Sequence, residues 1–330
     1  MFIQRILDKL NPLVGKGKNK PFFVKIGACS ICNLNCRDCY MRKSKTNFGN
    51  VGAGYLKYEN FVKFLDMNPF VREIELANHG EAFLNPDLAR ILETAYQRNI
   101  IISIAGGVNF NKVSDEQLEA LVKYSCVKCI SISIDGASQE VYSKYRRGGN
   151  FDTVINNIKK LNEYKRKYNT NFPILYWQYI VMDTNEDENE IKKAIKMSEE
   201  FNMEILFKKT YVYGYKPKNP ELISKLTGID FNNTNALFAN EKRFTPCLDL
   251  WRSPQINWDG RFLGCACNYE NPFDINVFET GLVKCLNSRM IRKTKKMLMG
   301  GKPYKKSPCY NCEFYKYELQ QNFITKEDIK

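Results

Sequence analysis

Residues 22–40 read FFVKIGACSICNLNCRDCY, a short apolar run that is followed at once by four cysteines. The run ends at Ala28 and is rich in aromatic and β-branched residues, which is typical of a buried strand. Cys32, Cys36 and Cys39 come next in the spacing C-x3-C-x2-C. The stretch therefore predicts a strand that delivers three closely spaced thiols to the loop at its carboxyl end.

The chain after this stretch alternates between short apolar runs and helix-period segments as far as about residue 212. Six β/α units in order predict a parallel sheet, because parallel neighbours need crossover helices and such crossovers are right-handed. We expect an α/β fold, a partial (β/α)6 TIM-like barrel whose site lies at the carboxyl ends of its strands. The expected strands are 22–28, 73–78, 100–105, 127–135, 174–182 and 204–211, and the expected helices are 58–66, 86–98, 115–124, 151–168 and 186–202.

The twelve cysteines are distributed in a way that indicates two separate metal centres. No stretch is apolar enough for a membrane span, and the first 20 residues lack the apolar core and cleavage site of a signal peptide. We therefore expect a cytoplasmic protein, where thiols are more often metal ligands or core residues than disulfides. Residues 130–246 contain no cysteine, so the thiols fall into an N-terminal and a C-terminal set.

The net charge of +14 favours an acidic partner or substrate. Nine Lys and Arg occur within 284–306 without an acidic residue, and a second basic segment covers 16–25. Neither segment has interleaved aromatic residues or a recognition-helix motif, so we do not expect nucleic acid as a partner. The surplus fits a substrate that carries phosphate or another acidic partner.

Three thiolates have a different chemical meaning from four. Four would close a tetrahedral zinc site, whereas three leave one iron of a 4Fe–4S cluster open for a substrate or cofactor. The spacing of Cys32, Cys36 and Cys39 therefore predicts an open cluster, and a zinc knuckle completed by Cys29 or His79 is the alternative.

Further segments follow the second and fourth expected strands. The second strand ends in Asn78-His79-Gly80-Glu81, and the fourth ends in SIDG at 133–136, followed by YRRGG at 145–149. Together with the three-cysteine loop, these segments resemble the radical S-adenosylmethionine (radical SAM) superfamily over residues 21 to about 212.

The resemblance implies roles for individual residues. Cys32, Cys36 and Cys39 would hold the cluster, Gly80 and Glu81 would bind the amino group of SAM, and Ser133 and Asp135 are candidate ribose contacts. Arg147 or Arg146 would pair with the SAM carboxylate. The chain departs from the family pattern at two places. The family has an aromatic residue just before the third cysteine, whereas here Tyr40 follows Cys39. His79 stands where the family has a glycine. His79 is a candidate catalytic residue or a structural one.

The C-terminal part resembles a SPASM or twitch domain with an auxiliary 4Fe–4S cluster. The resemblance covers Cys247, the segment NWDGRFLGC at 257–265 that ends in Cys265, and SPCYNC at 307–312 with Cys309 and Cys312. Asp-Gly at 259–260 predicts a hairpin, and a basic helix is expected near 288–299. Structural zinc is the alternative for these four thiols. The expected organisation is a basic, amphipathic extension at 1–20, the barrel at 21–215, a linker at 216–245 and the auxiliary-cluster domain at 246–330.

The resemblance implies an enzyme that oxidises or epimerises its substrate. We expect a polar carbohydrate or cyclitol-like substrate. A peptide maturase is the alternative, but those enzymes often carry a leader-binding domain before the barrel, and about 20 residues precede the first strand here. A non-catalytic zinc protein is the alternative from another class. Cys267 is the candidate hydrogen-atom donor of an epimerase, and the roles of the remaining thiols stay open; these are Cys29, Cys126, Cys129 and Cys285.

Overall fold

The computed structural model describes residues 20–43, 51–210, 212, 214–231, 247–268, 271–312 and 315–316. Most of the expected N-terminal extension, residues 232–245 of the expected linker and the last 14 residues lie outside the described part. Within it, the expected α/β fold with a partial barrel is confirmed.

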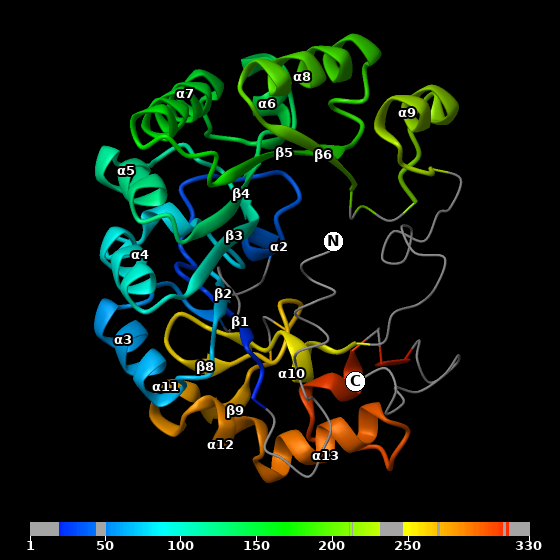
Figure 1. Ribbon diagram of the computed structural model, residues 1–330. Helices are drawn as coiled ribbons and strands as arrows, with labels where there is room; N and C mark the ends of the chain where they lie inside the picture. Colours follow the sequence, from blue (N-terminus) through cyan, green and yellow to red (C-terminus); the bar gives the residue numbers. More distant parts are fainter. Residues whose placement is uncertain are drawn as a thin grey trace.

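The described strands form a nine-stranded sheet in the order β6-β5-β4-β3-β2-β1-β7-β8-β9. Each of the first six strands is parallel to its neighbour. The sheet curves into an unclosed barrel with the helices on its outer side (Figure 1). The strands are β1 (Phe23–Ile26), β2 (Glu73–Glu75), β3 (Ile101–Val108), β4 (Val127–Ser133), β5 (Ile174–Val181), β6 (Glu204–Lys209), β7 (Gln255–Ile256), β8 (Arg261–Phe262) and β9 (Phe273–Asn276).

The helices that connect the parallel strands bury one apolar face against the sheet. They are α3 (Tyr58–Met67), α4 (Leu88–Gln97), α5 (Asp115–Lys123), α6 (Gln139–Tyr145), α7 (Phe151–Lys167) and α8 (Glu188–Glu200), with α9 (Pro220–Thr227) after β6. In α4, Leu88, Ile91, Leu92 and Ala95 are fully buried, at the i, i+3, i+4 and i+7 spacing of one helix face. A capping box between Ser114 and Gln117 begins α5.

The C-terminal segment continues the barrel sheet at the edge formed by β1. β7 pairs in parallel with β1, and β8 pairs with β7 as the antiparallel hairpin that Asp-Gly predicts. The helices of this segment are α10 (Asp249–Arg252), α11 (Val277–Thr280), α12 (Leu282–Leu286) and the expected basic helix α13 (Arg289–Leu298), with the 3-10 turn η3 (Pro308–Asn311) near the end. The two cysteine-bearing parts of the chain therefore share one sheet.

Close packing between strand ends shapes the carboxyl edge of the sheet. A Cβ on Gly106 would lie 1.6 Å from the carbonyl oxygen of Ala77, so only glycine allows this approach between β3 and the segment after β2. No described helix combines the length and apolar character that a bilayer span requires.

Candidate functional site

The cysteine loop follows β1 at the carboxyl edge of the sheet and is held by the segment after α6. The amide of Asn35 donates to the carbonyl oxygen of Arg147 at 2.9 Å, and the amide of Arg37 donates to that of Tyr145 at 3.1 Å. The guanidinium of Arg37 also binds both carboxylate oxygens of Asp183, at 2.6 and 3.1 Å. The loop is therefore fixed to the end of α6 and to the segment after β5 before α2 (Tyr40–Lys43) begins.

The three thiols of the loop lie close enough to influence one another and are surrounded by donors. Burial raises the pKa of Cys32 to about 11, and the charges of Cys36 and Cys39 add to the rise. The Cys32 sulfur accepts from the amide of Leu34 at 3.5 Å and from Nδ2 of Asn109 at 3.6 Å. Thiolates in a half-buried loop with N–H donors suit an iron-sulfur cluster, so the donor set fits.

Arg146, and not Arg147, reaches the thiols. Its Nη1 lies 3.7 Å from the sulfur of Cys36, where its charge lowers a pKa that burial otherwise raises. Its Nε donates to Oδ2 of Asp135 at 2.6 Å. The side chain of Arg147 is exposed, and its backbone carbonyl accepts from the amide of Asn35 in the cysteine loop.

Asp135 is a junction between the strand ends. Its Oδ1 accepts from the amide of Ile180 at 2.6 Å, and Nδ2 of Asn185 donates to its backbone carbonyl at 3.0 Å. These bonds hold Asp135 at a φ of +55°, which is unusual for a residue other than glycine. Both carboxylate oxygens of this candidate ribose contact thus have protein partners, one being Arg146.

Gly80 and Glu81 lie directly against the start of the cysteine loop. Gly80 has a φ of +71°, and a Cβ there would lie 2.3 Å from the carbonyl carbon of Ser30. Glu81 is 1% exposed, and its Oε2 accepts from the amide of Asn109 at 2.6 Å. Burial raises the pKa of Glu81 to about 7, while that hydrogen bond and the charge of Arg146 lower it. Because burial disfavours the ionised form of this carboxylate, a nearby cation such as an ammonium group would stabilise that form and bind well.

The two departures noted in the sequence meet in the structure. The Tyr40 hydroxyl is hydrogen-bonded to Nδ1 of His79, and the rings meet edge to face with centroids 5.8 Å apart. His79 is 4% exposed, and burial lowers its pKa to about 4. Its Nε2 is buried and has no hydrogen-bond partner among the described residues.

A chain of polar side chains crosses β4, β5 and β6 near their carboxyl ends. Nε2 of Gln178 donates to Oγ of Ser133 at 2.9 Å, and Nζ of Lys208 donates to Oε1 of Gln178 at 2.6 Å. Burial lowers the pKa of Lys208, and the nearby charge of Asp135 opposes that effect. A Cβ on Gly107 would lie 2.7 Å from the Ser133 hydroxyl, so β3 also approaches this chain closely.

Sequence reasoning missed several residues of this region. Glu75 is 6% exposed and accepts from the amides of Ala77 at 2.8 Å, Ala105 at 3.0 Å and Gly106 at 3.3 Å. A charged residue inside an apolar strand was a signal that could have identified Glu75, and Lys208 carries the same signal. Gln178 also carries it, as a polar residue inside the apolar strand β5, whereas Asn109 has no such signal, because amides are common at strand ends.

The C-terminal thiols form a second group. The pKa of Cys265 is raised by burial and then by the charges of Cys247, Asp249, Cys267 and Cys309. Cys312 influences Cys247 and Cys267 in the same way, so all four expected ligands and Cys267 lie near one another. Cys267 is exposed. No three His, Cys, Asp or Glu side chains of the described residues are arranged to hold a single metal ion.

Of the remaining cysteines, Cys29 lies beside the first group, where the charge of Cys32 adds to the rise that burial causes in its pKa. The buried sulfur of Cys29 donates to the carbonyl oxygen of Ile31 at 3.6 Å, and that of Cys126 donates to the carbonyl oxygen of Leu92 at 3.4 Å. Burial raises the pKa of Cys129 to about 11 and that of Cys285 to about 12. These are environments of unreactive core thiols.

Comparisons with known proteins were made for the whole chain. The family model described as "Radical SAM superfamily" matches residues 28–198, just over half of the chain. No curated protein matches it by sequence.

Three solved structures share the fold at low sequence identity. Streptococcus suis SuiB bound to precursor peptide SuiA is 14% identical with a TM-score of 0.62, over 83% of this chain and 66% of that one. The anSMEcpe structure with bound AdoMet is 16% identical with a TM-score of 0.55, over 91% and 94%. BtrN in complex with AdoMet and 2-DOIA is 12% identical with a TM-score of 0.50, over 89% and 93%. This chain thus spans just under two thirds of the SuiB chain.

The opposite pKa changes of Glu81 and His79 predict a pH dependence of stability. The raised pKa of Glu81 lowers the free energy of unfolding as pH rises from about 4.5 to about 7, because the folded state keeps a proton that the unfolded state loses. The lowered pKa of His79 raises the free energy of unfolding between about pH 4 and 6.5. Each effect amounts to about 3 kcal/mol, and in the wild type they offset each other.

Urea unfolding of the SAM-free protein from pH 4.5 to 7 checks this. Relative to wild type, Glu81→Gln should gain stability by about 3 kcal/mol as pH rises, and His79→Asn should lose a similar amount. The contributions of other titrating groups to the free energy of unfolding cancel when each variant is compared with wild type at the same pH. Parallel profiles for all three proteins would contradict the assignment of these charges to buried sites.

Proposed function

Because this chain belongs to the radical SAM superfamily, we propose that it oxidises or epimerises a polar, carbohydrate- or cyclitol-like substrate. When bound, the 4Fe–4S cluster and SAM supply a one-electron reductive cleavage and a 5′-deoxyadenosyl radical that removes a hydrogen atom from the substrate. Family membership makes the chain an enzyme and argues against a non-catalytic zinc protein.

The residues around the cysteine loop have complementary parts in this proposal. Cys32, Cys36 and Cys39 would hold three irons of the cluster and would leave the fourth open. Glu81, buried and close to Arg146, would accept hydrogen bonds from the amino group of SAM. The backbone at Gly80 leaves room for close approach.

Other residues orient the nucleoside and the carboxylate of SAM. Ser133 is the proposed ribose contact. Asp135 supports the site by holding Arg146 beside the loop, so Arg146 is better placed than the exposed Arg147 to meet a carboxylate. Tyr40 contributes to the proposed SAM site through its hydrogen bond to His79.

The polar chain across β4, β5 and β6 is the observation that carries the substrate class. Gln178 and Lys208 present an amide and an ammonium group in a row beside Ser133, the proposed ribose contact. Such groups match the hydroxyls and phosphate of a sugar or cyclitol better than the apolar side chains of a peptide. A lysine whose pKa burial lowers also gains from an anionic partner, which restores its preferred charge.

The second thiol group supports an auxiliary 4Fe–4S cluster held by Cys247, Cys265, Cys309 and Cys312. Four thiolates leave no open iron, so this group would exchange electrons and would not bind substrate. Cys267 is then the proposed hydrogen-atom donor if the product is an epimer. An acidic flavodoxin or ferredoxin fits the basic residues of 284–306 as electron donor.

Replacing Cys32, Cys36 and Cys39 together by Ala tests the radical chemistry. The variant should lose about half of its iron and all formation of 5′-deoxyadenosine, because only this loop leaves an iron open. Iron analysis and chromatography of dithionite-reduced assays measure both. The matched variant without Cys247, Cys265, Cys309 and Cys312 should keep some SAM cleavage. Retained cleavage in the triple variant would overturn the assignment.

Lys208→Met tests the substrate class, with Lys209→Met as its control. Nζ of Lys209 donates to the carbonyl oxygen of Asp230 at 2.7 Å, away from the polar chain. We expect sugar or cyclitol phosphates to stimulate 5′-deoxyadenosine formation by wild type. Lys208→Met should raise the half-saturating concentration about tenfold, since a charged hydrogen bond is lost, while Lys209→Met stays within about twofold.

Stimulation by peptides alone would replace this substrate class by peptide maturation. Equal effects of Lys208→Met and Lys209→Met would remove the polar chain from the substrate site.

Cys267→Ala separates oxidation from epimerisation. An oxidation passes the second electron to the auxiliary cluster, so this variant should keep its iron and still form oxidised product. Mass spectrometry of products formed in heavy water gives the answer. A variant that retains iron and SAM cleavage but no longer forms the deuterated product of wild type would establish the thiol as donor.

A further inference from the structure

The β7–β8 hairpin stands between the two groups of thiols. β7 pairs with β1, and the amide of Gly27 donates to the carbonyl oxygen of Ile256 at 3.0 Å. The turn closes at Gly260, whose φ is +90°. β1 leads into the cysteine loop and β8 leads to Cys265. The hairpin therefore pairs with the strand that precedes the first group of thiols, and it directly precedes a cysteine of the second group.

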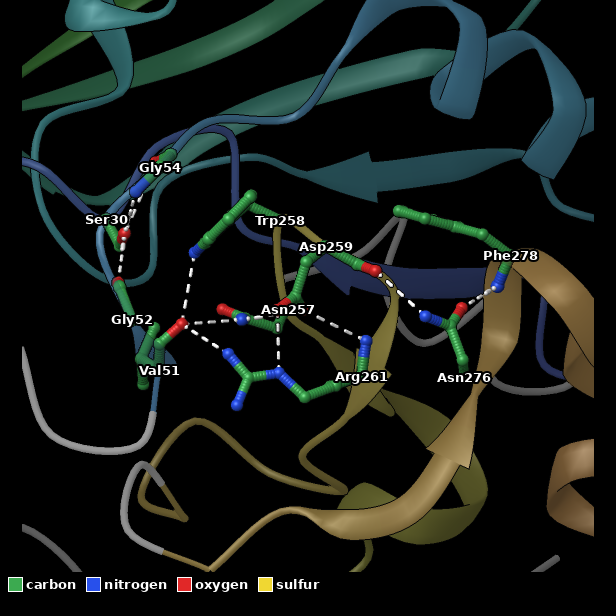
Figure 2. Close-up of polar contacts among 10 residues, drawn as sticks. All are labelled: Ser30, Val51, Gly52, Gly54, Asn257, Trp258, Asp259, Arg261, Asn276 and Phe278. Atoms are coloured by element: carbon green, nitrogen blue, oxygen red, sulfur yellow. Dashed lines mark hydrogen bonds and ion pairs between the residues drawn. The ribbon is translucent and has the colours of Figure 1, made fainter.

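Three side chains of the hairpin donate to one carbonyl oxygen, that of Val51 (Figure 2). The distances are 2.8 Å from Nδ2 of Asn257, 3.1 Å from Nε1 of Trp258 and 2.8 Å from Nη2 of Arg261. Asp259 orients this set, since its carboxylate accepts from Asn257 at 2.8 Å and from Nε of Arg261 at 2.6 Å. Val51 is buried, so its carbonyl depends on these donors.

The glycines after Val51 allow no space between this segment and the hairpin. A Cβ on Gly54 would lie 2.4 Å from Cη2 of Trp258. Gly52 has a φ of +72°, and its Cβ would lie 3.3 Å from Nη2 of Arg261. The segment 51–54 is therefore held in two ways. Hydrogen bonds fix the carbonyl oxygen of Val51, and the indole ring of Trp258 packs against Gly54.

Segment 51–54 in turn holds Ser30. The Ser30 hydroxyl donates to the carbonyl oxygen of Gly52 at 2.6 Å and accepts from the amide of Gly54 at 3.0 Å. The Ser30 amide donates to the carbonyl oxygen of Gly54 at 2.9 Å. Side chain and backbone of Ser30 are thus both bonded to the segment that the hairpin holds, as Figure 2 shows.

Ser30 is the last link before the cysteine loop and Glu81. The carbonyl of Ser30 lies under Gly80, and the amide of Glu81 donates to the carbonyl oxygen of Ile31 at 2.8 Å. Cys32 is the next residue along the chain. A displacement of Ser30 would therefore move the first cysteine and the buried carboxylate together.

We propose that Asn257, Trp258 and Arg261 are positioning residues of the SAM site, which they set through Val51, Gly54 and Ser30. This inference rests on the proposed function, because it takes Cys32 and Glu81 as parts of that site. It assigns the hairpin a second task besides carrying Cys265: the SAM-binding geometry depends on the placement of the C-terminal segment.

SAM affinity of the holoenzyme tests the proposal. Arg261→Met should weaken SAM binding about tenfold, because a charge-assisted bond to Val51 is lost. Arg261→Lys should recover part of the affinity, and Trp258→Phe should weaken binding by a smaller factor. Iron content should equal that of wild type, and the electron paramagnetic resonance spectrum of the reduced protein should lose part of its response to SAM.

Asn276→Ala is the matched control. Asn276 supports the same hairpin by donating to the carbonyl oxygen of Asp259 at 3.0 Å and accepting from the amide of Phe278 at 2.9 Å, and no hydrogen bond joins it to Val51 in Figure 2. General destabilisation of the hairpin would affect it as well, but its SAM affinity should stay within about twofold of wild type.

The outcomes are distinguishable. Wild-type protein that binds no SAM would overturn the proposed function itself. Wild-type SAM affinity in Trp258→Phe and Arg261→Met would overturn only the positioning role, as would an equal loss in Asn276→Ala. If Arg261→Met does not fold, Trp258→Phe and Arg261→Lys decide the question by the same affinities.

Discussion

The backbone of Gly80 rests on the carbonyl group of Ser30, and the site depends on this contact. It joins the loop that leaves β1 to the loop that leaves β2, and only a residue without a Cβ fits there. The hydrogen bond from Glu81 to Ile31 continues the contact by one residue. Thiols on one loop and a carboxylate on the other are thereby brought to one place at the carboxyl edge of the sheet.

Buried charge is the second feature around which this edge is built. Arg146 lies between Asp135 and Cys36, while Glu75 and Glu81 are met by backbone amides. Each charge has partners, because an isolated charge at low dielectric would be far too costly. The same partners make the groups rigid, which suits a site that must orient a cofactor and exclude water.

The sequence predicted the outline of the site better than its connections. The spacing of Cys32, Cys36 and Cys39 and the position of Glu81 after an apolar run could be interpreted from local pattern alone. Arg146 and Arg147 are adjacent and chemically equal in the sequence, so only the turn after α6 decides which of them faces the loop. The link between Tyr40 and His79 crosses two loops, and no local pattern encodes it.

The sequence by itself determined the six β/α units, the hairpin at 259–260 and the family to which the chain belongs, because hydrophobic period, turn chemistry and ligand spacing are local properties. Only the tertiary structure decided that β7 joins the barrel sheet beside β1 and that Asn257, Trp258 and Arg261 converge on Val51. These contacts join residues more than 200 positions apart. They arise from tertiary packing, which leaves no pattern in any short stretch of sequence.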